Sequence, residues 1–422
     1  MTGLALFGSL AFLLIVGVPV SISVGGATMF TLLMFYPIPV AVVAQRIFTA
    51  LDSVSIMAIP FFVLAGNLMT LGGISRRLVD FANQIVGNIR GGLCYAAVLA
   101  CAFFAALSGS GPATVLAVGS MMYPDMVRLG YPKERCAGLL AVAGGLGPVI
   151  PPSIIMVVYC TITNTSIVDM FKAGLIVGIV IVAALFGFCA FLGKKENWPK
   201  NEVKTSPGDF IISFLRAIPA ILLPVIVLGG IYSGLLTPTE AAAVATVYAL
   251  FTGLFVYREL RLKDLMQTIF NSAKSSAMIL FVIATASSFS WFFAYSGMSK
   301  GIVNAISALH LPATLFNLVI YLIFLFFGTF LEGISMCVLL VPVLYPVAAS
   351  LGVTSLHFGV IVCVAGVIGA MTPPVAVNIF AAASVSKLKM GEIAKGELPF
   401  FLGFTLVPLI FVLFPQVLQL FF

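Results

Sequence analysis

Two stretches of the sequence combine residue types that expose backbone oxygens to a cation. The first reads Ser-Gly-Ser-Gly-Pro-Ala-Thr over residues 108–114, and the second reads Gly-Gly-Leu-Gly-Pro-Val-Ile-Pro-Pro-Ser over residues 144–153. Pro151 and Pro152 cannot donate the hydrogen bonds that the carbonyls one turn earlier would accept in a helix. Unwound carbonyls and hydroxyls can coordinate a hard cation such as Na⁺. The alternatives are helix packing through small residues at 108–114 and a simple structural kink at 144–153.

Two polar side chains in apolar surroundings are further candidates. Glu332 lies inside an apolar stretch, where a carboxylate is costly and is a functional candidate by default, unless it faces water at the end of a hairpin. Asn378 follows Pro374 by one helical turn and could contact a substrate, although a packed polar residue fits the sequence equally well. We interpret Asp52 as a helix N-cap and Glu240 as an acid in a first helical turn.

The composition places the chain in a membrane. Of its 422 residues, 61% are hydrophobic and 8% are charged, whereas soluble domains carry about 25% charged residues. So few charges cannot cover a water-facing surface, and the apolar segments must face lipid or one another. The polar stretches are too short for a nucleic-acid domain, the phosphate-binding motif of ATPases is absent, and two remote histidines exclude a Ser/His/Asp triad. The seven scattered cysteines are interpreted as small core residues.

Apolar runs between charged or turn-rich breaks predict ten membrane spans. They cover residues 3–18, 21–36, 49–72, 136–163, 173–193, 211–235, 238–257, 275–297, 356–386 and 397–421. Two longer regions, 92–125 and 314–347, are each interrupted midway by a glycine-containing break. We predict that each forms a hairpin that enters the membrane and returns to the same side. The predicted fold class is an all-α polytopic membrane protein.

Basic residues predict the orientation of these spans. They gather in five clusters that the spans place on one side, which the positive-inside rule makes cytoplasmic. The clusters are Arg76, Arg77 and Arg90; Arg128, Lys133 and Arg135; Lys194, Lys195, Lys200 and Lys204; Arg258, Arg261 and Lys263; and Lys387, Lys389 and Lys395. Both termini are then expected outside. The polar stretch 194–210 is predicted to be a cytoplasmic linker between two halves, 1–193 and 211–422.

The two halves repeat one another at a fixed offset. Gly111 corresponds to Gly333, an offset of 222 residues, and no gap is needed. The same offset aligns Tyr123-Pro124 with Tyr345-Pro346, Gly147 with Gly369, and Pro151-Pro152 with Pro373-Pro374. The basic loop after the first hairpin has a counterpart without Lys or Arg, and each half has an odd number of spans, so we predict that the repeats are inverted. Inverted repeats with broken helices are typical of secondary transporters, which bind their substrate between the repeats.

Taken together, these motifs resemble a known family. The Pro-Pro segment, the two hairpins, Ala-Ile-Pro-Phe-Phe-Val-Leu-Ala-Gly at 58–66 and Thr-Pro-Thr-Glu-Ala at 237–241 are similar to the large membrane subunit of tripartite ATP-independent periplasmic (TRAP) transporters. The resemblance covers essentially the whole chain. It implies a multi-pass protein of the bacterial inner (cytoplasmic) membrane and an elevator mechanism, in which a transport domain with both hairpins slides against a scaffold domain. It also implies two partners, a small four-helix membrane subunit on a separate chain and a periplasmic substrate-binding protein.

The resemblance further implies two Na⁺ sites and a substrate cleft between the hairpin tips. The first Na⁺ site would use carbonyls of Ser108, Ser110, Gly147, Ile150 and Pro152. The pseudo-symmetric second site would involve Thr329, Gly333, Gly369 and Thr372, although the second tip departs from the Ser-Gly-Ser pattern. We expect the substrate cleft to be lined by Gly111, Thr114, Glu332 and Asn378.

The expected function is Na⁺-coupled import of an organic acid anion, such as a C4-dicarboxylate, sialic acid or a sugar acid, that the binding protein delivers. One alternative is a stand-alone ion-coupled symporter or exchanger of a related fold. A second alternative is a membrane-anchor subunit of an enzyme complex, which predicts paired intramembrane histidines or a cofactor pocket, and the sequence offers neither. The chain itself is not expected to be an enzyme.

Overall fold

A computed structural model describes residues 2–86, 89–200, 207–309 and 311–419. Within these ranges the regular structure is helical, apart from one isolated β-bridge between Arg90 and Lys200. The helices of the first half are α1 (Thr2–Ile15), α2 (Val20–Phe35), α3 (Ala41–Leu51), η1 (Val54–Met57), α4 (Ala58–Leu71), α5 (Ile74–Val86), α6 (Gly92–Ser108), α7 (Gly111–Arg128), α8 (Lys133–Gly144), α9 (Ile154–Thr163) and α10 (Ile167–Lys195). This architecture confirms the predicted all-α class.

The second half is helical in the same way. Its helices are α11 (Pro207–Tyr232), α12 (Pro238–Phe251), η2 (Thr252–Val256), α13 (Leu262–Tyr295), α14 (Met298–Ser307), α15 (Ala313–Gly328), α16 (Gly333–Ser350), α17 (Ser355–Gly369), α18 (Val377–Ser386), α19 (Met390–Leu413) and α20 (Pro415–Gln419). Among the described residues, seven helical segments are long and apolar enough to cross a membrane, and shorter apolar helices accompany them. The chain is therefore polytopic, as predicted.

Helix boundaries follow the offset found in the sequence. In each hairpin the second helix begins at the matched glycine, α7 at Gly111 and α16 at Gly333. The helices that follow the hairpins, α8 and α17, begin at Lys133 and Ser355, which are again 222 residues apart. Both Pro-Pro pairs lie in breaks between helices and have cis peptide bonds. The inversion of one half against the other stays a prediction.

Several predicted boundaries were wrong. The predicted span 49–72 is divided, because α3 ends at Leu51 and α4 begins at Ala58. Asp52 is consequently the residue after α3 rather than an N-cap, whereas Glu240 does close a capping box with Thr237 at the start of α12. The helix that contains the predicted span 275–297 begins earlier, at Leu262, because no glycine or proline interrupts α13.

The predicted linker 194–210 is shorter than expected. Helix α10 continues to Lys195 and α11 already begins at Pro207, so helices occupy both of its ends. Residues 201–206 lie outside the described residues, as does His310.

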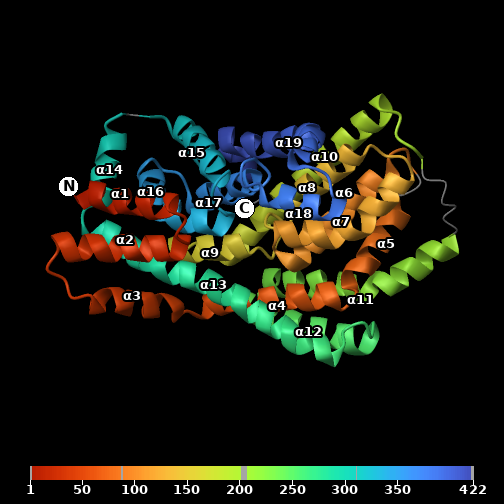
Figure 1. Cartoon of the computed structure of the whole chain (residues 1–422), viewed down its shortest axis with the longest axis horizontal. Helices are drawn as coiled ribbons and strands as arrows, with labels where there is room; N and C mark the ends of the chain where they lie inside the picture. Colours follow the sequence, from red (N-terminus) through yellow and green to blue (C-terminus); the bar gives the residue numbers. More distant parts are fainter. Residues whose placement is uncertain (1, 87–88, 201–206, 310, 420–422) are drawn as a thin grey trace.

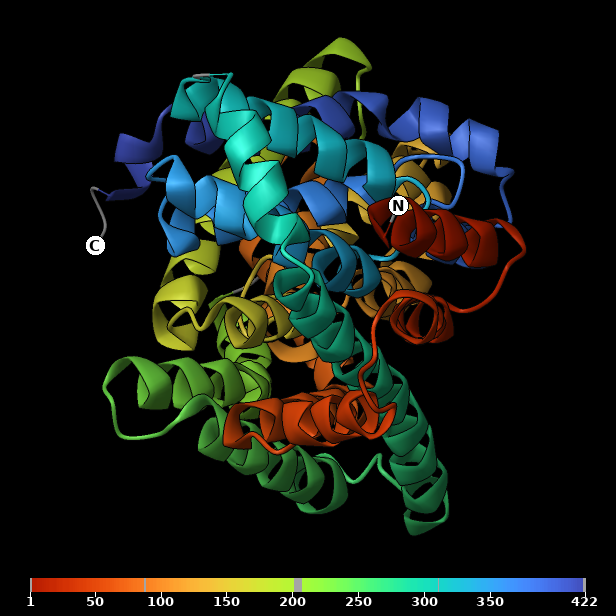
Figure 2. The same cartoon turned by 90° about the vertical axis from the view of Figure 1, so that its left-hand side faces the viewer.

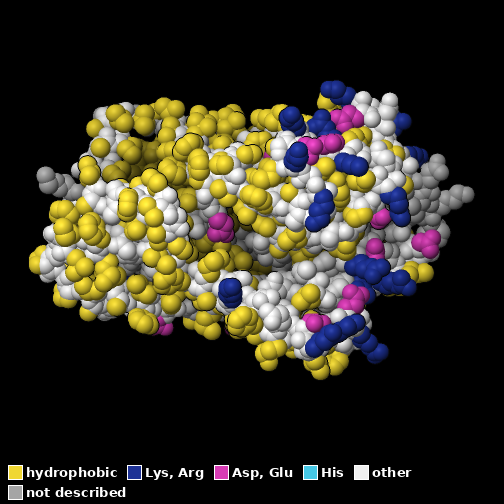
Figure 3. All heavy atoms as spheres, viewed as in Figure 1, with side chains coloured by type: hydrophobic (Ala, Val, Ile, Leu, Met, Phe, Trp, Pro, Cys, Tyr) yellow, Lys and Arg dark blue, Asp and Glu magenta, His cyan; other side chains and the backbone are white. Residues whose placement is uncertain are grey.

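The five basic clusters, apart from Lys204, which lies outside the described residues, gather at one end of the molecule (Figure 3). The assignment of this end to the cytoplasm stays a prediction. Arg77 forms an ion pair with Glu259, which joins the first cluster to the fourth. The bridge between Arg90 and Lys200 joins the first cluster to the linker. Arg135 pairs with Glu196 at 3.0 Å and donates a hydrogen bond to the carbonyl of Gly396, so it joins the second cluster to the linker and to the fifth. Figure 3 shows most of the visible Lys and Arg side chains gathered over this end, while hydrophobic side chains predominate on the rest of the visible face among a few scattered charged ones.

Two groups of helices pack against each other around the hairpins. Helices α3, α4, α11, α12 and α13 lie along the lower side of Figure 1, and α6 to α10 with α15 to α19 lie above them. The quarter-turn view in Figure 2 keeps the same separation. Two amphipathic helices connect the groups: α5 packs on α11 and α6, and α14 packs on α13 and α16. This arrangement leaves the hairpin tips facing α4 and α13.

A close contact between α8 and α19 holds the upper group together. A Cβ placed on Gly138 would collide with the backbone of Glu397, and backbone cannot move aside cheaply. We predict that Gly138→Ala lowers the free energy of unfolding by about 1–3 kcal/mol, the usual cost of overpacking. Thermal unfolding of the purified chain measures this effect. Gly391→Ala is the matched control in α19, since its Cβ meets no atom within 4 Å; equal losses in both variants would contradict the prediction.

Candidate functional site

The tip of the first hairpin is an unwound turn whose oxygens point toward one another. Helix α6 ends at Ser108, Gly109 adopts a left-handed φ of 60°, and Ser110, in an extended conformation, is the N-cap of α7. The Thr114 hydroxyl donates to the carbonyl oxygen of Ser110 at 2.7 Å and lies 3.0 Å from the Ser108 hydroxyl. The sequence folds this way because glycine tolerates a positive φ and Pro112 is accommodated in the first turn of a helix. The turn gathers one carbonyl and two hydroxyls in one place.

The first Pro-Pro break packs directly against this tip. A Cβ on Gly147 would lie 2.5 Å from the Ser110 carbonyl oxygen and 2.9 Å from the Thr114 hydroxyl. A Cβ on Gly109 would lie 2.8 Å from the carbonyl oxygen of Pro152. The tip and the break therefore touch through backbone at two points, and only glycine fits at either. Four residues of the predicted first Na⁺ site, Ser108, Ser110, Gly147 and Pro152, are brought together here.

Ile150 belongs to the same break, and its side chain packs against α10. That side chain is buried, and a Cβ on Gly178 would lie 2.6 Å from its Cγ1. Ser153 closes the break by donating a hydrogen bond of 2.6 Å to the Pro148 carbonyl. The role of Ile150 as a cation ligand stays a prediction.

The second hairpin tip meets the second Pro-Pro break in a comparable way. A Cβ on Gly328 would lie 2.9 Å from the Cα of Gly369, so the end of α15 touches the end of α17. The carbonyl of Thr329 accepts a hydrogen bond of 3.1 Å from the backbone N–H of Val375, beyond the break. The Thr372 hydroxyl donates to the carbonyl of Ile368 at 2.9 Å and keeps its lone pairs for another partner.

Gly333 completes the second tip. It starts α16, and a Cβ placed on Gly366 would lie 3.7 Å from its Cα. The four residues of the predicted second Na⁺ site, Thr329, Gly333, Gly369 and Thr372, thus lie on one tip and the break packed beside it. At this tip the hydroxyl of Thr329 donates to the carbonyl of Phe326, and no hydrogen bond joins two hydroxyls among its described residues, unlike those of Ser108 and Thr114 at the first tip.

Asn378 belongs to the second half of the chain, and its side chain contacts residues of the first half. Its side-chain amide donates a hydrogen bond of 3.1 Å to the carbonyl of Ala141 in α8. Its Oδ1 atom is buried without a hydrogen-bond partner, and a Cβ placed on Gly111 would lie 2.7 Å from it. A buried amide oxygen without a partner costs roughly 1–3 kcal/mol, so its retention needs an explanation. A bound cation or a substrate hydroxyl would satisfy this oxygen.

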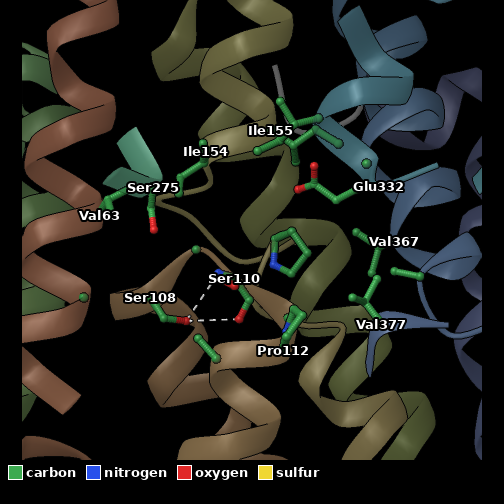
Figure 4. A pocket seen from close by; sticks show the side chains of 18 of the residues that line it. Val63, Ser108, Ser110, Pro112, Ile154, Ile155, Ser275, Glu332, Val367 and Val377 are labelled. Carbon is green, nitrogen blue, oxygen red and sulfur yellow. Dashed lines mark hydrogen bonds between the residues drawn. The ribbon is translucent and has the colours of Figure 1, made fainter. Parts of the chain in front are cut away.

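A cavity of 360 Å³ lies between the two tips. Its floor is the first tip, its opposite side carries Glu332 and Gly333 of the second tip, and α4 and α13 close it with Asn67 and Ser275. In Figure 4 the carboxylate of Glu332 points into this space, and Ser275 faces it from the other side. Pockets of about 300–1,000 Å³ are the usual size for small-molecule sites. We call this space the central cavity.

The charge of the central cavity is unusual for an anion site. Of the described residues that line it, none is Lys, Arg or His, and the single ionisable side chain is the carboxylate of Glu332. Glu332 makes no capping hydrogen bond to the helix that it precedes. The carboxylate of Glu332 would repel a carboxylate ligand placed here. A compensating positive charge must therefore come from outside these side chains.

The predicted substrate residues divide into two sets. Gly111, Glu332 and Asn378 line the central cavity, together with Ser108 and Ser110 of the predicted Na⁺ site. Thr114 is fully buried behind the first tip, and its hydroxyl belongs with the oxygens there rather than with the cavity wall. Its position therefore suits a cation ligand better than a substrate ligand.

Sequence reasoning missed the contribution of α4 and α13. Asn67 and Thr70 of α4 line the central cavity, and the Asn67 amide donates a hydrogen bond of 2.8 Å to the hydroxyl of Ser272 in α13. The signal was present, because Asn67 is the only amide side chain in the apolar run 58–71. The buried residues Thr268, Ser272 and Ser276, which are spaced four residues apart, place their hydroxyls along one face of α13, and Ser272 on this face contacts α4 through Asn67.

The chain matches one family of transporters over nearly its whole length. The family model described as "Tripartite ATP-independent periplasmic transporter, DctM component" matches residues 7–417. The C4-dicarboxylate TRAP transporter large permease protein DctM of Pseudomonas aeruginosa is 42% identical over 85% of this chain and 83% of its own length. DctM of Rhodobacter capsulatus is 37% identical over 99% of this chain and 100% of its own length. The sialic acid TRAP transporter large permease protein SiaM of Vibrio cholerae is 32% identical over 98% and 96%.

A solved structure shares the fold. The Alcanivorax borkumensis YdaH transporter superposes with a TM-score of 0.63 over 89% of each chain, at 14% sequence identity. At that identity the likeness concerns the fold alone.

Proposed function

The chain belongs to the family of tripartite ATP-independent periplasmic transporters as its DctM component, and from this premise we propose that it carries an organic acid anion together with Na⁺ through the central cavity. Membership makes it a multi-pass permease of the bacterial inner membrane and not an enzyme. The family implies a small membrane subunit and a periplasmic binding protein as partners. Two relatives are named for C4-dicarboxylates and one for sialic acid, so we propose an acid of this kind, or a sugar acid, as the substrate.

The proposal depends above all on the charge of the central cavity. The described residues that line this cavity include one carboxylate, that of Glu332, and no cationic side chain. An acid anion that enters it therefore finds no positive charge on the protein. Two like charges about 8 Å apart repel by about 2 kcal/mol at an effective dielectric constant of ~20. Co-bound cations would supply the missing positive charge. This need favours cotransport with Na⁺ over uptake of the anion alone.

The backbone around the first tip offers ligands of the right kind. The carbonyl of Ser110 and the hydroxyls of Ser108 and Thr114 meet there, and the backbone of Gly147 and Pro152 closes against them. Hard cations prefer such neutral oxygens at close range. We place the first Na⁺ among them.

The second Na⁺ belongs at the second tip. Thr329, Gly333, Gly369 and Thr372 supply carbonyls and hydroxyls there in a looser arrangement, since the Thr329 carbonyl already accepts from Val375. Ser108 and Ser110 of the first site and Gly333 of the second line the central cavity, so cations at the two tips would lie on either side of a single anion. The transport domain of an elevator would then carry the ions and the acid inward as one load.

The decisive experiment is uptake into proteoliposomes that contain this chain and the small subunit, with the loaded binding protein outside. We expect the acid to accumulate only when a Na⁺ gradient points inward. Two Na⁺ with a monoanion such as a sugar acid carry one net charge, so a membrane potential of 100 mV, negative inside, should add about 2.3 kcal/mol of driving force. With a dianionic C4-dicarboxylate, two Na⁺ would give no net charge and no such effect. Uptake that ignores the Na⁺ gradient would overturn the coupling. Uptake that continues without the binding protein would favour a stand-alone symporter instead.

Glu332→Gln tests the electrostatic argument directly. Its carboxylate attracts cations to the central cavity and repels the acid, so its neutralisation should act on the two ligands in opposite directions. We predict a half-saturating Na⁺ concentration about 5- to 30-fold higher, and a lower KM for the acid once Na⁺ is saturating, from about 1–2 kcal/mol of charge interaction. Proteoliposome uptake at varied Na⁺ and varied acid measures both. A variant in which both constants move in the same direction would contradict the argument.

A further inference from the structure

A second cavity, of 810 Å³, lies away from the two tips. It opens between helices of both groups: α3 and α13 on one side, and the end of α9, the start of α10 and Pro342 of α16 on the other. Its position relative to the basic clusters follows from the two ends of the helices that line it. Helix α13 begins beside the basic cluster at Arg258 and carries Trp291, which lines this cavity, near its far end. Helix α10 likewise ends in that basic region and lines the cavity with its first turn.

The second cavity is therefore at the end opposite the basic clusters, which is the outer end. It contains a cationic side chain where the central cavity has none. Arg46 of α3 lines it and lies over the ring of Trp291, with 5.3 Å between the guanidinium carbon and the ring centroid. Among the described residues Arg46 forms no ion pair. Its guanidinium keeps a fork of donors that matches a carboxylate, and the stacked ring holds that fork in place.

The surrounding wall supplies weaker donors rather than competing acids. Hydroxyl and amide side chains line the second cavity around Arg46: Ser53, Ser55, Thr161, Asn164, Thr165, Ser287 and Ser290. No Asp or Glu is among the described lining residues. Of the acids in neighbouring segments, Asp169 pairs with Lys172 and Glu240 caps α12 through Thr237. Asp52, the residue after α3, is exposed and is not among the residues that line the cavity.

We propose that the second cavity is an outer binding site for a carboxylate, with Arg46 as its bidentate donor and Trp291 as its platform. It would receive the acid from the binding protein before the acid reaches the central cavity. The naming of the ligand as the transported acid rests on the proposed function. The carboxylate chemistry rests on the unpaired guanidinium, the stacked indole and the hydroxyl-lined wall alone. A site of this kind would hold the acid outside without Na⁺, since here the protein itself provides the positive charge.

Trp291 gives a direct readout of occupancy. The chain has two tryptophans, so Trp198→Phe leaves Trp291 as its only indole. We would titrate the intact membrane complex with this variant, in nanodiscs of zwitterionic phosphatidylcholine and without Na⁺ or the binding protein, using succinate as the probe. The same complex with Trp291→Phe added serves as the blank. We expect a saturable change in Trp291 fluorescence with succinate and none with uncharged succinamide.

Arg46 variants decide whether the guanidinium is responsible. Arg46→Gln should abolish the fluorescence change or raise the half-saturating succinate at least 10-fold, and Arg46→Lys should fall between, because an ammonium cannot bind a carboxylate through two parallel bonds. A response that survives Arg46→Gln, or no response in the unsubstituted site, would overturn the proposal. A change that appears only when ligand-free binding protein is added would assign Arg46 to protein docking and would equally overturn it. The titration needs neither Na⁺ nor transport, so it can fail while Na⁺-driven uptake succeeds.

Discussion

Replacing Gly147 with alanine should raise the half-saturating Na⁺ concentration for uptake roughly 5- to 150-fold. The added Cβ would lie 2.5 Å from the Ser110 carbonyl oxygen and 2.9 Å from the Thr114 hydroxyl. Overpacking of this kind costs about 1–3 kcal/mol, which corresponds to that range of affinities. The cost falls on the atoms proposed to coordinate the first Na⁺, because the clash can be relieved only by moving the tip away from the break. Initial uptake rates across a range of Na⁺ concentrations measure the shift.

A matched control separates ion binding from general damage. Gly187→Ala makes the same chemical change in α10, where a Cβ meets no atom within 4 Å. We expect this variant to transport with unchanged Na⁺ dependence. Comparison of thermal stability in the two variants then shows whether the protein remains folded. A Gly147→Ala protein that keeps normal Na⁺ affinity would remove the first tip from the coupling mechanism.

Replacing Asn378 with leucine should reduce transport at limiting Na⁺ and acid by about 10- to 150-fold. Leucine is close to asparagine in shape but lacks the Oδ1 atom that is buried without a partner beside the first tip. A hydrogen bond or ion contact to a charged ligand is worth about 1.5–3 kcal/mol, which gives the expected range. Leucine also removes the hydrogen bond that the side-chain amide of Asn378 donates to the carbonyl of Ala141. Titration of uptake against Na⁺ and against the acid shows which ligand Oδ1 contacts.

Asn317→Leu provides a close control for burial. Asn317 is 1% exposed, like Asn378, and its Oδ1 also lacks a hydrogen-bond partner. It lies in α15 and does not line the central cavity. We expect Asn317→Leu to transport with normal affinities. Equal loss in both variants would mean that buried amides support folding here, and Asn378 would lose its assignment as a ligand.

Motifs that break helices were readable from the sequence because their chemistry is local. Glycine and proline interrupt a helix wherever they stand together, so the residues alone were enough to locate the two tips and both Pro-Pro breaks. The fixed offset between Gly111 and Gly333 similarly predicted where α16 and α17 begin. The basic clusters were placed correctly at one end because charged side chains avoid the bilayer core over its whole thickness.

What the sequence could not show was which surfaces meet. Asn67 lines the central cavity only because α4 packs beside α13, and nothing local in an apolar helix indicates its neighbour. Thr114 is expected to line the substrate cleft, whereas the turn of α7 directs its hydroxyl to the carbonyl of Ser110. The early start of α13 was missed because a polar first turn resembles a loop when the packing that stabilises it is unknown.

The crossing of Asn378 into the first half has a consequence for how the ions load. Its amide is fixed to α8 while its free oxygen touches Gly111, and its own helix follows the break that packs on the other tip. In the proposed mechanism, a Na⁺ ion bound at either tip would therefore shift a residue that contacts both halves of the chain. We therefore expect Na⁺ to bind cooperatively, with a sigmoidal rather than hyperbolic dependence of uptake on Na⁺ concentration. The transporter with a single bound Na⁺ would then be rare, and little Na⁺ would enter the cell without substrate.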